Sequence, residues 1–441
     1  MSNVRGHFAD TIRLIEAGAL SSRRPSLLLL VALSLASHIP TRRAPHALAP
    51  RASMGDRSRR GAIVDRPLVV LFCGLEFHQG FACTKRRCDA LNAASGSAGI
   101  EVVACARSEV AARIADADIA VPLMTRLDDA ILGAATRLRL VLQFGVGLEG
   151  VDEAACTRRG IALARVPSQH TGNADSTAEM AVFLLLASMR RVNEMADSIR
   201  DRTLGSPWGR SLVGARVHIV GWGDIARKIA RRLAPFGCEL SASRARDPDG
   251  TWRRRRDGRA TSARSLRTAS DGAPEPPDRP GPEPGPEPSD DDDPIEALVP
   301  HRGVGREDTI AAVAECDAFV LACAQTPANR GMVDAAFLDA AKPGAVCVNV
   351  ARGGLFDRDA VLAALNDGRL GYLASDVAWA EPLDPSDAVA RHPRAYFTPH
   401  VGGVTESSYE TMAAIVAEEA ARARRGEGCS DRVSVVNGGE I

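Results

Sequence analysis

The chain has 441 residues, too many for one ordinary domain, so its length predicts two folded lobes with additional segments. Because 55 Lys and Arg residues balance 55 Asp and Glu residues, no net field recruits nucleic acid or an anionic membrane surface, and neither is expected as a partner. The ten cysteines contain no Cys-x-x-Cys pair, which favours reduced thiols over a disulfide framework or a zinc site; no metal is expected.

Residues 1–62 differ in composition from the rest of the chain. Arg residues recur among Ala, Pro and Ser, acidic residues are scarce before Asp56, and the apolar stretch 26–36 is too short to span a bilayer. This composition is typical of an organellar presequence, with a plastid favoured and a mitochondrion or the cytoplasm left open; the mature form is expected to lack a membrane segment. A disordered extension or a misassigned start is the alternative.

Residues 66–172 alternate short apolar runs with alanine-rich helical segments. Such alternation predicts an α/β fold with a doubly wound parallel sheet, here a flavodoxin-like substrate lobe. The expected strands are residues 68–72, 100–105, 119–123, 138–144 and 161–166.

A glycine loop, Gly145-Val146-Gly147, follows the fourth of these strands. Ligands bind at the carboxyl ends of parallel strands, and glycine lets bare amides approach a small anion. We therefore expect Gly145, Val146 and Gly147 to hold a substrate carboxylate. A simple turn is the competing interpretation.

A second lobe is expected over residues 173–401, entered through one long helix at residues 173–200. Its apolar run 217–220 leads into Gly221-Trp222-Gly223-Asp224-Ile225-Ala226 and then into an amphipathic helix. This order predicts the strand, tight turn and helix of a Rossmann dinucleotide-binding unit.

Each position in this turn has a physical purpose. Gly221 would supply the backbone angles of the turn, and Gly223 would let a pyrophosphate approach. The helix that begins at Asp224 and Ile225 would direct its free amides and its dipole toward that anion. A tight connection without a ligand is the alternative, since the motif alone is weak.

Arg244 ends the next expected strand, where a dinucleotide fold usually places an acid for the ribose 2′-hydroxyl. A cation there suits a 2′-phosphate, so NADP(H) is favoured and NAD(H) remains possible. The alternative is that Arg244 and Arg246 are solvent-exposed cations at a strand end. Residues 247–300 follow, rich in Arg, Pro, Glu and Asp, and are expected to form a disordered surface insertion in which a spacer is favoured over a docking role.

Three residues at expected strand ends could carry out a reaction. Arg352 lies on a glycine turn and could clamp a carboxylate. His400 could exchange one proton near neutral pH, and Glu381 could orient its ring and favour the protonated form. Singly, each has an ordinary structural explanation, but together and in this order they indicate a catalytic site.

The stretches around Gly221, Arg352, Asp376 and His400 closely resemble the D-isomer-specific 2-hydroxyacid dehydrogenases. The separation from Arg352 to Glu381, 381 − 352 = 29, is similar to that of the phosphoglycerate dehydrogenase branch. The segments after Asp376 and Pro399 resemble a plant and algal, plastid-type subgroup.

The resemblance implies roles for several residues. Arg352 would bind a 2-keto acid, His400 would donate the proton and Glu381 would be its partner. The cofactor would meet Thr326, Ala351 and Asp376, the last at the nicotinamide amide. The family also implies a homodimer and a first lobe completed by residues 402–437. Ala226 replaces the usual third glycine, and Arg244 replaces the usual acid, which puts NAD in doubt.

These expectations describe an oxidoreductase that transfers hydride to C2 of a short 2-keto acid while His400 protonates the oxygen, giving a D-2-hydroxy acid. Glyoxylate or hydroxypyruvate reductase and phosphoglycerate dehydrogenase are the nearest activities. Formate dehydrogenases share the fold but lack the carboxylate beside the histidine, so Glu381 argues against them. A dinucleotide-sensing, corepressor-like binding protein is the alternative from another class.

Overall fold

A computed structural model describes residues 62–63, 66–95, 99–169, 171–247, 252 and 294–439. The expected presequence lies almost wholly outside these residues, as does the middle of the expected insertion. Both sheets described below belong to one compact unit. No helix in the described ranges combines the length and the apolar character needed to cross a bilayer.

The first sheet has six strands in the order β13-β5-β4-β3-β1-β2, and the five that precede β13 in sequence run parallel. This is the flavodoxin-like order expected from the sequence. The strands are β1 (Leu68–Cys73), β2 (Ile100–Cys105), β3 (Ile119–Val121), β4 (Leu140–Gln143), β5 (Ala162–Arg165) and β13 (Ser434–Val435). Its helices are α2 (His78–Ser95), α3 (Val110–Arg113), α4 (Asp129–Ala134), α5 (Glu153–Arg158) and α12 (Glu406–Arg425), with 3₁₀ turns η1 (Arg107–Glu109) and η2 (Ile114–Asp116).

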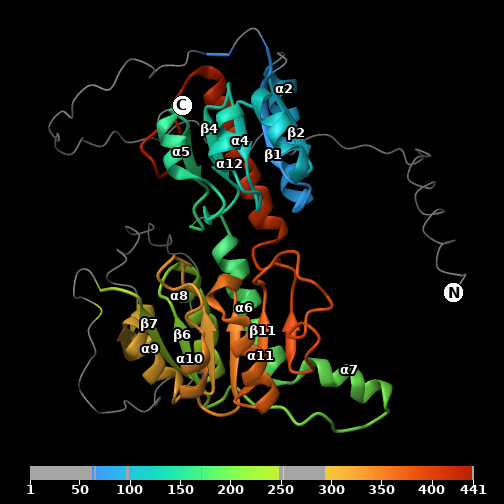
Figure 1. The fold of residues 1–441 in the computed structure, drawn as a ribbon, viewed down its shortest axis with the longest axis vertical. Coiled ribbons are helices and arrows are strands. Elements are labelled where there is room, and N and C mark those ends of the chain that lie inside the picture. Colours follow the sequence, from blue (N-terminus) through green and yellow to red (C-terminus); the bar gives the residue numbers. More distant parts are fainter. Residues whose placement is uncertain are drawn as a thin grey trace, which may run out of the picture. The chain divides into compact units, whose positions relative to one another are not determined.

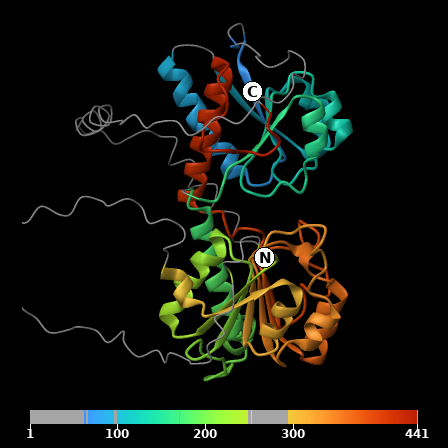
Figure 2. The ribbon, with the colours of Figure 1, turned by 90° about the vertical axis from the view of Figure 1, so that its left-hand side faces the viewer.

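Both faces of this sheet are buried, because successive side chains of a strand point in opposite directions. Val70 and Phe72 of β1 belong to one apolar cluster, while Leu71 and Cys73 belong to another. Helix α12, from the end of the chain, packs beside α2 over the first of these clusters (Figure 1 and Figure 2). The C-terminal segment therefore helps to cover the sheet formed by the beginning of the described chain.

The second sheet has seven parallel strands in the order β12-β11-β10-β9-β6-β7-β8. The order reverses next to β6, which is the switch point where a doubly wound sheet binds its ligand. The strands are β6 (Arg216–Val220), β7 (Glu239–Arg244), β8 (His301–Val304), β9 (Ala318–Leu321), β10 (Ala345–Asn349), β11 (Leu370–Ser375) and β12 (Ala395–Phe397). The helices are α6 (Asn173–Met189), α7 (Val192–Arg200), α8 (Asp224–Leu233), α9 (Gly305–Val313), α10 (Ala335–Ala340) and α11 (Arg358–Asp367), with 3₁₀ turns η3 (Ala234–Phe236), η5 (Pro294–Leu298) and η6 (Gly353–Leu355).

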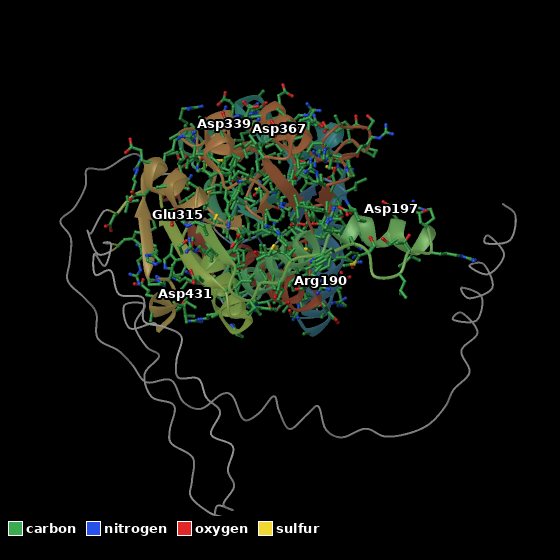
Figure 3. The ribbon with its side chains drawn as sticks, turned by 90° about the horizontal axis from the view of Figure 1, so that it is seen from below. Arg190, Asp197, Glu315, Asp339, Asp367 and Asp431 are labelled. Carbon is green, nitrogen blue, oxygen red and sulfur yellow. The ribbon has the colours of Figure 1, made fainter. Side chains whose placement is uncertain are left out.

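The structure confirms the expected fold class and corrects one helix. Residues 173–200 form two helices, α6 and α7, because Arg191 adopts a left-handed conformation with φ of 60°. A left-handed residue ends an α-helix, and the chain leaves in a new direction. Helix α7, which carries Asp197, projects away from the rest of the lobe (Figure 3).

The expected insertion also needs correction at both ends. Trp252, Ile295 and Val299 are buried in the core of the second lobe, and the Trp252 ring lies 5.3 Å from the Trp222 ring. The hydrophilic composition of the surrounding stretch concealed these residues, because a few apolar side chains are enough to anchor a segment to a core. Trp252 and residues 294–300 therefore belong to the folded lobe, while residues 248–251 and 253–293 of the expected insertion lie outside the described residues.

Candidate active site

The glycine turn after β6 leaves room for a ligand beside the start of α8. Gly221 has φ of 108°, and a Cβ there would lie 2.8 Å from the carbonyl of Ala322. At Gly223, by contrast, an added Cβ would meet no described heavy atom within 4 Å. This space faces the N-terminus of a ten-residue helix. The free amides and dipole of that helix fit a pyrophosphate, so the residues present suit a dinucleotide.

The side chain of Asp224 is occupied by a contact with the first lobe. Ser168 Oγ donates a hydrogen bond to Asp224 Oδ2 at 2.9 Å. The carboxylate is therefore held by the protein, and the backbone amides of Asp224 and Ile225 remain the groups suited to an anion.

Arg244 lies half-buried at the end of β7, with its guanidinium 4.3 Å from the centre of the Trp252 ring. Within the described part of the chain, Arg244 has no carboxylate partner. A stacked guanidinium keeps its N–H donors in the plane of the fork, where they can bind an anion. No pattern in the sequence predicted this role of Trp252, which directly precedes a run of arginines. Arg246 is exposed.

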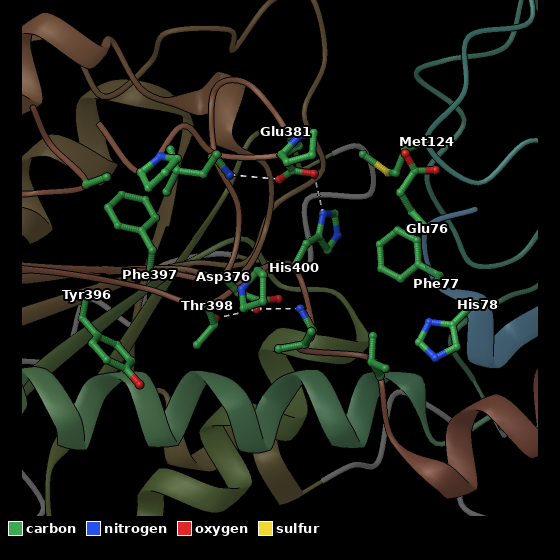
Figure 4. A pocket seen from close by; sticks show the side chains of 18 of the residues that line it. Glu76, Phe77, His78, Met124, Asp376, Glu381, Tyr396, Phe397, Thr398 and His400 are labelled. Atoms are coloured by element: carbon green, nitrogen blue, oxygen red, sulfur yellow. Dashed lines mark hydrogen bonds and ion pairs between the residues drawn. The ribbon is translucent and has the colours of Figure 1, made fainter. Parts of the chain in front are cut away.

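His400 and Glu381 form a hydrogen-bonded pair. His400 Nδ1 lies 2.7 Å from Glu381 Oε2, and the amide of Ala378 donates to Glu381 Oε1 at 2.9 Å (Figure 4). The Phe77 ring meets the imidazole edge-on, with ring centres 5.9 Å apart. Since Nδ1 is engaged by the carboxylate, Nε2 is the nitrogen left to exchange a proton with a ligand.

Two opposing effects act on the pKa of Glu381. Burial raises this pKa, whereas the hydrogen bond and charge interaction with His400 lower it, and the net result is a pKa below the ordinary value of 4.5. Glu381 is therefore ionised at neutral pH, with its negative charge against the His400 ring.

Asp376 holds the loop that presents His400. Its carboxylate accepts hydrogen bonds from Thr398 Oγ1 at 2.6 Å, from the Val401 amide at 2.9 Å and from the Gly402 amide at 2.7 Å. His400 itself has a positive φ of 56°, a conformation that persists only where the surroundings enforce it. Burial raises the pKa of Asp376 despite these hydrogen bonds.

Arg352 lies against the glycine loop of the first lobe. Its Nη1 donates to the Ala351 carbonyl at 2.8 Å, and its Nε donates to Glu149 Oε1 at 3.0 Å. A Cβ at Gly147 would collide with Arg352 Nη2 and with Glu149 Oε2. Glycine at position 147 therefore lets the guanidinium and the loop amides approach the same place.

One small cavity, about 130 Å³, brings together residues from both sheets. A larger cavity of about 780 Å³ is lined by His400, Glu381 and Asp376 and by apolar side chains that include Tyr396 and Phe397 (Figure 4). Of the residues singled out from the sequence, Gly145, Val146, Gly147, Ile225, Arg352, Asp376 and His400 line the small cavity.

Six of the expected cofactor residues line neither cavity: Gly221, Gly223, Asp224, Arg244, Thr326 and Ala351. Thr326 is exposed, and its amide donates to Asn329 Oδ1 at 2.7 Å. Ala351 is buried, and its amide donates to Asn349 Oδ1 at 2.9 Å. Neither residue lines the two cavities.

Sequence reasoning missed several residues of this site. Gln143, Asn173 and Thr177 line the small cavity, and Phe77 lines both. Asn173 and Thr177 were detectable, because they begin a helix that follows a glycine at the junction of the lobes. Glu149 and Phe77 carried no such signal.

The described residues contain no group of three or more His, Cys, Asp or Glu side chains placed to hold a metal ion. All ten cysteines are free thiols, and none lines either cavity.

Comparisons with known proteins agree with this geometry. The family described as "D-isomer specific 2-hydroxyacid dehydrogenase, NAD binding domain" has a sequence model that matches residues 182–271 and 293–402. The D-3-phosphoglycerate dehydrogenase of Mycobacterium tuberculosis is 30% identical over 335 residues, covering 75% of this chain and 54% of that protein. The chain thus spans about half the length of the mycobacterial relatives it matches.

For two further matches, the aligned region includes most of the matched protein. The glyoxylate reductase/hydroxypyruvate reductase of Homo sapiens is 28% identical over 311 residues, covering 69% of this chain and 80% of that protein. A crystal structure of a Thermus thermophilus protein has a TM-score of 0.61 at 24% identity and covers 82% of this chain and 98% of its own. The second match shows a shared fold.

The two doubly wound sheets and the cavity lined from both define a two-lobed, dinucleotide-binding α/β protein. The chain belongs to the D-isomer specific 2-hydroxyacid dehydrogenase family, as its sequence motifs indicated.

Proposed function

We propose that the protein is an NAD(P)-dependent dehydrogenase that interconverts a short 2-keto acid and a D-2-hydroxy acid. The observation that carries this proposal is the cavity of about 130 Å³ lined by Arg352, His400 and the loop Gly145–Gly147. A guanidinium and bare amides suit a carboxylate, and a histidine held by a carboxylate suits proton transfer to the neighbouring carbonyl oxygen.

Different residues of the chain bind the substrate and transfer the proton during reduction. Arg352 and the amides of Val146 and Gly147 bind the substrate carboxylate and orient the 2-keto group. His400 Nε2 gives a proton to the C2 oxygen as negative charge develops there, and Glu381 stabilises the charged ring. A bound dihydronicotinamide supplies the hydride that C2 receives. The oxidation of the hydroxy acid is the same sequence in reverse.

The test is a spectrophotometric screen of glyoxylate, hydroxypyruvate, pyruvate and 3-phosphohydroxypyruvate with NADPH and with NADH. Oxidation of either cofactor, dependent on one of these acids, is the expected result. Failure of all eight combinations would contradict the proposal. The corepressor-like alternative has no observation in its favour, since the curated relatives described above are named as enzymes.

We further propose that NADP(H) is the preferred cofactor. Arg244 ends the second strand of the dinucleotide unit, is braced by Trp252 and has no carboxylate partner among the described residues. A free guanidinium there suits the 2′-phosphate that distinguishes NADP from NAD.

We also propose a homodimer. The segment from α7 to the start of β6 carries strongly exposed apolar side chains: Ile199 is 80% exposed, Leu204 100%, Trp208 90% and Val213 76%. Exposed apolar groups gathered on one projecting segment are typical of a protein interface. A second copy of the chain, presenting the same segment, would cover them.

A plastid is the location we propose, because residues 1–62 are rich in Arg, Ala and Ser and poor in acids. Imaging of the full chain fused to a fluorescent protein tests this, with a chain that begins at residue 63 as the control. Plastid signal for the full chain alone is the expected result. Nuclear signal would contradict it and favour the corepressor-like alternative.

A further inference from the structure

Gln143 presents an unsatisfied acceptor at the end of β4. The side chain is 8% exposed, and its Nε2 donates a hydrogen bond to the Leu123 carbonyl at 3.0 Å. A carbonyl can only accept, so this contact fixes which end of the amide is nitrogen. The other end, Oε1, is buried and has no hydrogen-bond partner among the described residues.

A buried acceptor of this kind is costly unless something pairs with it. Leaving a buried polar atom unsatisfied is unfavourable, and nearly all such atoms in native proteins find partners. Gln143 lines the small cavity together with Arg352 and His400. The cavity is also lined by apolar side chains, Leu123, Phe144 and Met124 among them, and by Asn173 and Thr177, whose hydroxyl donates to the Asn173 carbonyl at 2.9 Å. The partner of Oε1 is therefore expected to come from the molecule that enters the cavity.

The other polar groups of the cavity restrict what that partner can be. In the proposed function, Arg352 and the glycine loop take the substrate carboxylate, and His400 takes the oxygen on C2. What remains of a short 2-keto acid is the substituent on C3. A neutral acceptor oxygen attracts a hydroxyl donor, leaves a methyl group without a hydrogen bond and repels a phosphate dianion.

We infer, on the basis of the proposed function, that Gln143 selects substrates with a hydroxyl group on C3. The preferred class is the 3-hydroxy-2-keto acids, of which hydroxypyruvate is the smallest. The C3 hydroxyl donates to Gln143 Oε1, and the amide is held in place by its own hydrogen bond to Leu123. A site that pairs with a hydroxyl discriminates strongly against an analogue that lacks it.

The first test uses the unaltered protein with hydroxypyruvate, pyruvate and 3-phosphohydroxypyruvate. We expect kcat/KM for hydroxypyruvate to exceed that for pyruvate by roughly 10- to 100-fold, the ratio that corresponds to one buried hydrogen bond. Equal rates with hydroxypyruvate and pyruvate would overturn the inference, as would a preference for the phosphorylated acid. Either result would leave the proposed dehydrogenase function intact. Turnover of none of these acids, with glyoxylate inactive as well, would overturn both proposals.

The second test replaces Gln143 by methionine, which has a similar length and no acceptor amide. Q143M is expected to lose roughly 10- to 100-fold in kcat/KM for hydroxypyruvate, mainly through KM, and to lose less for pyruvate, so that the ratio of the two kcat/KM values falls. Pyruvate thus serves as the internal control for folding and cofactor binding. An equal loss with both substrates would show a structural role for Gln143 and overturn the inference. If Q143M does not fold, the comparison with the unaltered protein still decides the question.

Discussion

Arg352 Nε donates to Glu149 Oε1 at 3.0 Å, so the cation expected to bind the substrate carboxylate already holds a carboxylate of the protein. The two residues are 203 positions apart in sequence and lie in loops that follow strands of different sheets. Both side chains are partly exposed, which limits such a pair to about 0.2–1 kcal/mol. The pair is therefore weak enough for a substrate to displace.

We predict that E149Q lowers KM for the 2-keto acid by roughly 1.4- to 5-fold, because the substrate no longer competes with Glu149 for the guanidinium. Steady-state kinetics with saturating cofactor measures this change. E153Q, which removes an exposed carboxylate at the start of α5, is the matched control and should leave KM unchanged. A higher KM in E149Q would mean that Glu149 positions Arg352 rather than competes for it.

Removal of the His400 imidazole should slow the chemical step without weakening cofactor binding. H400A is expected to lower kcat by on the order of a hundred- to ten-thousand-fold, since His400 is the one histidine among the described residues that line the small cavity. Binding of the cofactor, followed by fluorescence quenching, should be unchanged. Near-normal turnover in H400A would refute the assignment of His400 as the proton donor.

The lowered pKa of Glu381 makes part of the stability depend on pH. Because the pKa in the folded protein lies below the ordinary 4.5, the stabilisation is complete above pH 4.5 and is lost as the pH falls through the folded pKa. The unaltered protein should therefore have a higher Tm than E381Q at pH 7, and the difference should shrink below pH 4.5. A Tm difference that does not change with pH would show that the Glu381–His400 pair does not contribute through its charge.

Cofactor preference should depend on Arg244. R244A is expected to raise KM for NADPH by roughly 10- to 100-fold, the effect of losing a charge-assisted hydrogen bond, and to leave KM for NADH nearly unchanged. R246A is the matched control, because Arg246 is exposed two residues further along. Equal effects of R244A on both cofactors would argue against a 2′-phosphate contact.

The projecting segment should determine the oligomeric state. L204E places a charge on a fully exposed apolar residue, which costs little in a monomer and much in an interface. Sedimentation velocity should show a dimer for the unaltered protein and a monomer for L204E. L91E changes a leucine on α2 that is 42% exposed and should remain dimeric. A monomeric unaltered protein would contradict the proposed homodimer.

Hydrophobic patterning and glycine placement were enough to predict the elements and their class. The run 217–220 and the glycines after it specify a strand and a turn through backbone geometry and the period of buried side chains, both of which are local properties. For the same reason, the order of Arg352, Glu381 and His400 at expected strand ends indicated a site.

Only the tertiary structure decided which side chains meet. The pairing of Arg352 with Glu149, the three hydrogen bonds that hold Asp376 to the His400 loop, and the burial of Trp252 beside Trp222 all join distant parts of the chain. The Oε1 of Gln143, buried and unpaired among the described residues, likewise becomes apparent only in the fold, where the amide nitrogen donates to the Leu123 carbonyl. Such contacts depend on how two sheets pack, and packing involves all of their side chains at once, so no local pattern encodes it.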